Sequence, residues 1–327
     1  MRIIRFETLM ALPLLLMMLC CQAAPLATSD QAQALFAAEH YQAAIEEADR
    51  VLAIDPADSE ALNIKARAVS VLGDDRSAIR LVTQALEAAG KTGRASVVQQ
   101  ATYWNNLGYF NERQRNFDYA LDCYQKSLKM RLAALGANDL QTADSYNNLG
   151  TTLSKLGRNA EAFANLRKSL ALRQRLLGEH DATVAVALNN LGNAYAQQGD
   201  YRSALPLFQQ ALDIDMALHG PSHPTVAIRW NNMGDAYRGL GQYDQAEVFL
   251  SKALASDLAT FGENHPKVIL RYSNLARVYE AQGDRSKASA AYTKALQIVR
   301  QVDPDDAGQI HYLQGRLQAL QHSPNPV

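Results

Sequence analysis

The sequence feature that most constrains the fold is a four-residue motif that recurs every 42 residues. Asn105-Asn106-Leu107-Gly108 returns at that interval at 147–150, 189–192 and 231–234, and in the divergent form Ser-Asn-Leu-Ala at 273–276. A fixed period between about 20 and 50 residues is typical of a chain that stacks one supersecondary unit many times. We therefore predict a repeat protein.

Two further sets of residues keep the phase of this motif and predict two helices in each repeat. When Ala101 is counted as position one, position four is large and apolar, position eight is small, and position eleven is aromatic in three of five copies. These spacings lie on one stripe of a helix. A second stripe has Ala at position 20 and Leu at position 28 in all five copies. Glycine, which tolerates the positive φ of a helix end, separates the stripes in four copies, so each repeat is predicted to be a helical hairpin.

The spacing of small, large and aromatic residues in these hairpins resembles the tetratricopeptide repeat. The 42-residue period, with Gly and then His-Pro between hairpins at 220–224 and 262–266, resembles the long subtype of kinesin light chains. The resemblance covers nearly the whole mature chain and implies an all-α, right-handed α-solenoid. The sequence departs from the pattern where Arg115 replaces the turn glycine and Asn111 replaces the aromatic residue. We expect these departures to affect local packing only.

The repeat phase divides the chain into a leader, about seven hairpins and a capping helix. Residues 1–24 are predicted to be a signal peptide. A last amphipathic segment at 303–321 is expected to cover the open apolar flank of the array, and the tail at 322–327 is expected to be disordered. The hairpins are predicted at 25–58, 59–100, 101–142, 143–184, 185–226, 227–268 and 269–302.

The leader predicts export. Arg2 and Arg5 precede an apolar run that ends at Cys21, which is shorter than the ~20 residues of a membrane-spanning helix and typical of a signal-peptide core. We expect a periplasmic or secreted protein, similar to exported bacterial members of the family. Cys20 or Cys21 offers an alternative, in which the mature chain begins with a lipidated Cys at the outer membrane. The Met-Met-Leu before them is not the small pair that such a site resembles.

Charge and cysteine content narrow the function further. Loss of Arg2, Arg5 and Glu7 with the leader leaves a formal charge of −2, which argues against general nucleic-acid binding or binding to anionic membranes. No transmembrane span is predicted. Cleavage after Cys21 leaves Cys123 as the only cysteine, so an internal disulfide is excluded, and we expect a solvated or half-buried thiol.

No catalytic or metal-binding pattern stands out. His219 and His223 are four residues apart, but Gly220 and Pro221 interrupt the helix that a metal site at that spacing needs. His223 and His265 precede Pro, which favours a role at helix starts. The glycines are single and follow the repeat period, so no phosphate-binding loop is indicated. We predict no enzyme, no cofactor and no metal site; an enzyme with a site between repeats is the least favoured alternative.

The candidate binding surface is the face of each first helix that points away from the apolar stripe. At about 100° per residue, positions two, five, six, nine, twelve and thirteen point that way. The resemblance implies that this face lines a concave groove that holds a peptide or helix of a partner protein. The Asn pairs form two ladders there, whose amides can donate to and accept from a peptide backbone. The predicted groove residues are Asn105, Asn106, Asn147, Asn148, Thr151, Asn189, Asn190, Asn193, Asn231, Asn232, Asp235, Arg238, Asn274 and Arg277.

An alternative for the ladders is that they cross-link neighbouring hairpins. Asn is roughly 0.5 kcal/mol less favourable than Ala inside a helix, so a run of Asn pairs needs a reason, and either role supplies one. Arg238 and Arg277, with Arg229 and Arg271 at the groove edge, give the C-terminal half a slight basic bias that favours an acidic or carboxylate-ended ligand. The leading hypothesis is an exported adaptor that mediates protein–protein interaction. A self-assembling scaffold of a cell-envelope complex is the alternative, and the oligomeric state stays open.

Overall fold

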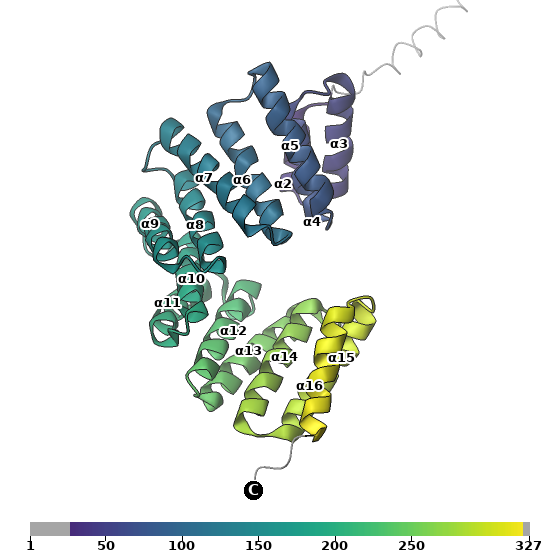
Figure 1. Ribbon diagram of the computed structural model, residues 1–327, viewed down its shortest axis with the longest axis vertical. Coiled ribbons are helices and arrows are strands. Elements are labelled where there is room, and N and C mark those ends of the chain that lie inside the picture. The colour runs from purple at the N-terminus through teal and green to yellow at the C-terminus, as the bar shows by residue number, and fades with distance from the viewer. Residues whose placement is uncertain (1–26, 323–327) are drawn as a thin grey trace, which may run out of the picture. The chain divides into compact units, whose positions relative to one another are not determined.

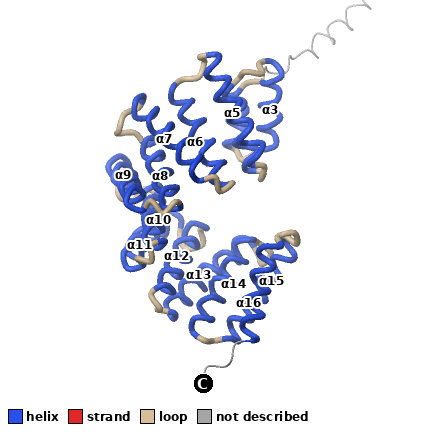
Figure 2. The backbone as a smooth tube through the Cα atoms, in the orientation of Figure 1, coloured by secondary structure: helices blue, strands red, loops and turns tan. Residues whose placement is uncertain are grey.

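The computed structural model describes residues 27–322, and all regular structure in that range is α-helical (Figure 1). Figure 2 shows these helices joined by short loops, with no strand between residues 27 and 322. The all-α repeat solenoid predicted from the sequence is confirmed. The predicted signal peptide and lipid anchor lie outside the described residues.

The contacts between residues divide the chain into two units, which meet between Arg115 and Asn116. In the first unit the helices are α2 (Ser29–Ala37), α3 (Tyr41–Ile54), α4 (Ser59–Val71), α5 (Asp75–Thr92) and α6 (Val97–Arg113). The helices of the second unit are α7 (Phe117–Ala134), α8 (Leu140–Lys155), α9 (Asn159–Leu177), α10 (Ala182–Gln197), α11 (Tyr201–His219), α12 (Pro224–Gly239), α13 (Tyr243–Phe261), α14 (Pro266–Gln282), α15 (Arg285–Val302) and α16 (Ala307–His322).

The first helices of the second unit each begin at a side chain that caps the helix. Asp139 and Asp181 accept a backbone hydrogen bond with a carboxylate oxygen, and His223 and His265 accept one with the ring atom Nδ1. Pro follows each His at the first helical position, where its missing N–H is not needed. The prediction that these His-Pro pairs start helices is confirmed.

The turns inside the hairpins depend on a left-handed backbone residue. Gly157, Gly199 and Gly241 have φ between 73° and 78°. Arg115 occupies the same place with φ of 63°, a conformation that is unfavourable by about 1–2 kcal/mol for a residue with a Cβ atom. The departure from the repeat pattern at Arg115 therefore leaves local backbone strain and does not change the turn.

The two helices of a hairpin approach closely at the predicted small positions. A Cβ atom on Gly192 would lie 2.6 Å from Cε1 of Phe208, and one on Gly150 would lie 2.6 Å from Cγ of Leu166. No real Cβ atom comes that close to a carbon, so position eight must be small for the large residue at position 24 to pack there. The predicted close approach of α10 to α11 and of α8 to α9 is confirmed.

In the second unit, successive first helices also contact one another. α8 contacts α10, α10 contacts α12, and α12 contacts α14, whereas contacts of that extent are not found between the described second helices of this unit. Neighbouring hairpins of this unit are therefore closer together at their first helices than at their second helices, so the first helices form the inner side of the stack. The face of α8, α10, α12 and α14 that points away from the hairpin core lies on that side, and we call it the inner face.

The last helix caps the array. Leu313 of α16 is fully buried in a cluster with Tyr292, Leu296 and Val299 of α15. Ile310, Leu317 and Leu320 pack against the same cluster, as the amphipathic pattern predicts. The helix extends to His322, which the sequence analysis assigned to the tail; that boundary is wrong by one residue, and the rest of the tail lies outside the described residues.

Candidate functional site

The two Asn ladders are joined to each other across four repeat junctions, one in the first unit and three in the second. The amide at position six donates to the amide oxygen at position five of the preceding repeat. The N···O distances are 2.8–2.9 Å for the pairs Asn106 to Asn63, Asn190 to Asn147, Asn232 to Asn189 and Asn274 to Asn231. The cross-linking alternative is therefore what these side chains do.

Asn63 was missed because the motif has diverged to Asn-Ile-Lys-Ala at 63–66, although Asn63 keeps the 42-residue interval to Asn105. Asn63 lies 43 residues before Asn106, which is the offset of every other cross-link. A search for Asn at that offset, in place of a search for the four-residue motif, finds it in the sequence.

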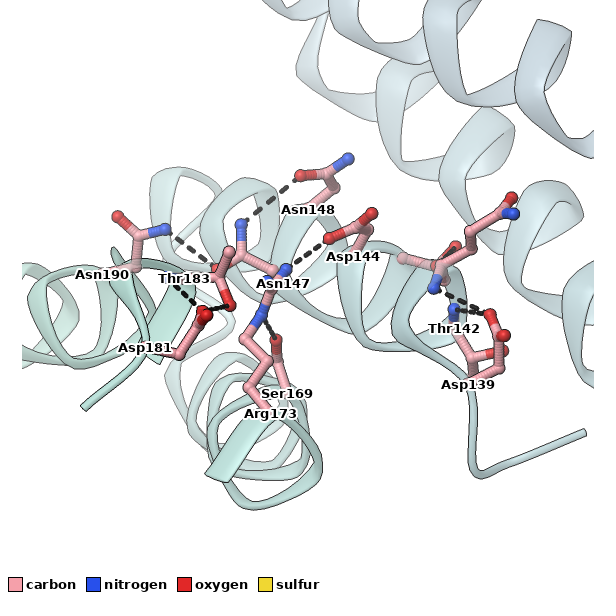
Figure 3. A network of polar contacts seen from close by, with 12 residues as sticks. Asp139, Thr142, Asp144, Asn147, Asn148, Ser169, Arg173, Asp181, Thr183 and Asn190 are labelled. Carbon is pink, nitrogen blue, oxygen red and sulfur yellow. Dashed lines mark hydrogen bonds and ion pairs between the residues drawn. The ribbon is translucent and has the colours of Figure 1, made fainter. Parts of the chain in front are cut away.

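A second set of hydrogen bonds joins the two amides of one repeat. Asn147 Nδ2 donates to Asn148 Oδ1 at 3.4 Å, and Asn231 and Asn232 are joined in the same way at 3.5 Å. Figure 3 shows Asn190, Asn147 and Asn148 linked in a row by these bonds. The result is an amide chain in two runs, Asn190–Asn147–Asn148 and Asn274–Asn231–Asn232–Asn189, which link neighbouring first helices along the inner face.

The amide chain does not use all the hydrogen-bonding capacity of its members. An Asn amide has two N–H donors and two acceptor lone pairs, and a ladder bond uses one donor of one residue and one lone pair of the other. Asn189 and Asn274 are buried, at 6% and 7% exposed, whereas Asn105, Asn106, Asn147, Asn148, Asn190, Asn231 and Asn232 are half-buried. The half-buried amides remain accessible on the inner face.

Arg229 and Arg271 do not lie at the groove edge, and that expectation is wrong. Arg229 Nε donates to Asp215 Oδ2 at 2.9 Å, and Arg271 Nε donates to Asp257 Oδ2 at 2.8 Å. All four side chains are 5% exposed or less. Position three points into the junction with the preceding second helix, so these arginines are neutralised inside the stack and add no basic character to the inner face.

The two earlier junctions have Arg on the second helix instead. Arg131 Nη1 donates to the carbonyl of Gln141 at 2.7 Å and to Ser145 Oγ at 2.9 Å, and burial lowers the pKa of its guanidinium. Arg173 pairs with Asp144 and donates to Ser169 Oγ, as Figure 3 shows. The Asp144 carboxylate, at position two of α8, is thereby neutralised by its own repeat.

The variable position nine holds the polar groups of the inner face that differ from repeat to repeat. Thr151 donates to the carbonyl of Asn148 in its own helix, and Asp235 pairs with Arg238 at 2.7 Å. Asn193 and Arg277 are half-buried, and neither makes a hydrogen bond or ion pair with any residue between 27 and 322. Among the predicted groove residues of the second unit, Arg277 is therefore a cation available to a partner.

A row of aliphatic side chains lies beside these polar groups. Val186 of α10 is 45% exposed and Leu270 of α14 is 47% exposed, and between them Ile228 of α12 is half-buried. All three occupy position two, where α8 has Asp144. The sequence analysis placed position two on this face but did not recognise the row, although its 42-residue spacing is visible in the sequence.

The remaining candidates for chemistry are buried or used in structure. Cys123 is fully buried, and burial raises the pKa of its thiol to about 12, so the expectation of a solvated or half-buried thiol is wrong. Within residues 27–322, no group of three His, Cys, Asp or Glu side chains could hold a metal ion. No helix of that range is long and apolar enough to cross a membrane.

The chain belongs to the tetratricopeptide repeat family. Models of this repeat match residues 29–91, 99–175, 152–217, 183–259 and 225–301, which together span most of the described helices. The fold is that of protein–protein interaction scaffolds, and its members are generally non-enzymatic adaptors. The chain has no match among the curated proteins.

Solved structures of similar fold include kinesin light chain-like TPR proteins. The crystal structure of BtubC (BKLC) from P. vanneervenii is 26% identical, with a TM-score of 0.57, over 70% of this chain and 92% of that one. A putative kinesin light chain with TPR-like repeats from Podosopora anserina is 19% identical, with a TM-score of 0.56, over 65% of this chain and 100% of that one. A Rap protein complexed with Competence and Sporulation Factor is 13% identical, with a TM-score of 0.58, over 81% of this chain and 75% of that one.

Proposed function

We propose that this chain is an exported, non-enzymatic adaptor that holds a peptide segment of a partner protein on its inner face. The observation that carries the proposal is the aliphatic row at position two of α10, α12 and α14, beside Asn193 and Arg277, which have no partner between residues 27 and 322. Apolar side chains that gather on one face of a protein surface are a common feature of interaction sites. The Rap protein solved with a bound factor is a precedent within the fold.

The amide chain has two roles in this proposal. Its cross-links hold successive first helices at a fixed distance, so the inner face is preorganised and a partner loses less free energy in ordering it. The lone pairs and N–H groups that the cross-links leave unused can then bond with the backbone of the partner, whatever its sequence. Selectivity comes from positions two and nine, which vary between repeats.

The test is recovery of partners by the mature chain, residues 25–327, and by variants at exposed positions. Changing the Asn residues would remove the cross-links as well as the binding groups, so Val186→Asp and Leu270→Asp are better probes. Val248→Asp is the matched control, because Val248 is 48% exposed on α13, a second helix. We expect both inner-face variants to lose partners that the control retains. Equal recovery of partners by the parent chain and all three variants would contradict binding at the inner face.

Export to the periplasm or the medium belongs to the same proposal and rests on the leader alone. The apolar run that ends at Cys21 predicts cleavage near Ala23, or lipidation if cleavage leaves a Cys at the new terminus. Fractionation of expressing cells, followed by determination of the N-terminal residue of the mature chain, tests both. A chain that retains Met1 in the cytoplasmic fraction would contradict the export proposal.

A further inference from the structure

We infer that the partner segment is an extended peptide with aliphatic side chains at every third residue and an acidic group where it crosses α14. This inference rests on the proposed function, because it concerns the same inner face. It goes further by naming the repeats that bind, the conformation of the guest and the chemistry that they select.

The binding repeats are the three that carry the aliphatic row. Val186 and Leu270 expose nearly half of their surface, and with Ile228 they give one aliphatic side chain to each of three consecutive first helices. The corresponding residue of α8 is Asp144, whose carboxylate pairs with Arg173. An apolar guest therefore gains apolar contact area over α10, α12 and α14, whereas α8 offers it a carboxylate at the corresponding position.

The spacing of this row sets the spacing of the guest. Packed helices lie about 8–10 Å apart, and the Asn cross-links at 2.8 Å hold α10, α12 and α14 in contact. An extended chain in the polyproline II conformation advances about 3.1 Å per residue and returns to the same face every three residues, so it advances about 9.3 Å per turn. Each third side chain of such a guest meets the next aliphatic residue of the row.

An α-helical guest fits this surface less well. Its backbone N–H and C=O groups bond within the helix, so they leave the free capacity of Asn190, Asn231 and Asn232 unused. An extended guest presents those groups along its whole length. The combination of an aliphatic row and a neighbouring amide chain favours the extended form.

The position of the acidic group in the guest follows from the one unpaired charge that we identify on the inner face of the described residues, that of Arg277. Asp235 and Arg238 pair with each other, and Glu280 is held by Arg316 of α16 and by the hydroxyl of Tyr292. Arg277 has no partner in the described part of the chain, and it lies two turns after Leu270 on the same helix. A carboxylate of the guest, from a side chain or a C-terminus, can pair with it.

The experiment selects peptides from a random display library on the mature chain, residues 25–327, and measures binding of the enriched sequences as synthetic peptides by fluorescence anisotropy. We expect enriched peptides to have aliphatic residues at i and i+3 together with Asp, Glu or a free C-terminal carboxylate. Leu270→Asp and Arg277→Glu should weaken binding by at least about tenfold, whereas Val248→Asp should leave it unchanged. A peptide with Lys in place of the acidic residue should recover affinity for Arg277→Glu.

The outcomes separate this inference from the proposed function. Peptides that need Val186 and Leu270 but ignore Arg277, or that have apolar residues seven apart, would overturn the inference and leave the proposed function standing. Peptides that bind all the variants equally, or a library that yields no peptide, would overturn both. Far-ultraviolet circular dichroism of each variant confirms that a loss of binding is not a loss of helix.

Discussion

The buried ion pair between Arg229 and Asp215 allows a quantitative test of how the repeats are held together. The two side chains are 5% and 2% exposed, their Nε···Oδ2 distance is 2.9 Å, and desolvation lowers the pKa of the Arg229 guanidinium. Asp215→Asn would leave that guanidinium buried without a counter-charge. Removal of one partner from a buried pair is unfavourable by about 3–5 kcal/mol. We expect Asp215→Asn to lower the free energy of unfolding by that amount.

The same reasoning predicts a partial rescue by a second change. Asp215→Leu combined with Arg229→Met replaces both charges with apolar groups of similar volume, an exchange that is often neutral or stabilising for buried pairs. The double variant should therefore be more stable than Asp215→Asn. Glu161→Gln is the control, because Glu161 and the N-cap residue Arg158 form an exposed pair at the start of α9, and such pairs contribute only about 0–1 kcal/mol.

The assay is urea unfolding of residues 25–327, followed by circular dichroism at 222 nm. Repeat arrays can unfold in more than one step, so the slopes of the transitions must be compared before their midpoints. The reasoning is refuted if Asp215→Asn is no less stable than Glu161→Gln. It is also refuted if the double variant is no more stable than the single one, since the loss would then come from packing and not from the unpaired charge.

Three further predictions concern single sites. Gly192→Ala should destabilise the chain by about 1–3 kcal/mol in urea unfolding, because the added Cβ atom would lie 2.6 Å from Phe208. Gly90→Ala, where the added Cβ atom would meet open space on α5, should instead stabilise the chain by about 0.5–1 kcal/mol. Equal effects of the two changes would contradict the close-packing argument. The Cys123 thiol, with its pKa raised to about 12, should resist iodoacetamide at pH 8 and react in urea; rapid labelling of the folded chain, detected by mass spectrometry, would show that the site opens. Hydrogen bonds to the side chain and backbone of Thr183 hold the pKa of the Asp181 carboxyl below its ordinary value of 3.8, so the stabilisation from this cap is present above about pH 4 and lost as pH falls below it. Asp181→Asn should therefore lose less stability than the parent chain between pH 5 and pH 3, and identical losses would refute the assignment.

The sequence predicted the hairpins because their determinants are local. The small residue at position eight, the large residue at position 24 and the capping residue before each first helix all act within one repeat. The face of each first helix could also be assigned, because the helical period fixes the direction of every side chain. Asn193 and Arg277 were assigned to the inner face in this way, and their role in binding stays a prediction.

The errors at Arg229 and Arg271 concern interactions between repeats. Arg229 was expected at the groove edge. Its partner Asp215 belongs to the preceding hairpin, so nothing within the repeat of Arg229 shows that it is buried. Whether Asn147 bonds with a guest or with Asn190 likewise depends on the distance between two helices. The helical period fixes the direction of a side chain but not the distance to the next helix, so the sequence left both alternatives open.

The order of the buried charges restricts which repeat units could be deleted by recombination. In the first two junctions of the second unit, the second helix carries a buried guanidinium, that of Arg131 or Arg173. In the next two junctions, the second helix carries a buried carboxylate, that of Asp215 or Asp257. Excision of residues 187–228 would shorten the array by one unit and bring Arg173 opposite Arg229, two buried cations in one junction. Excision of residues 229–270 would instead bring Asp215 opposite Arg271 and preserve a neutral pair. Loss of one repeat by excision of residues 229–270 is therefore far better tolerated than loss of one repeat by excision of residues 187–228.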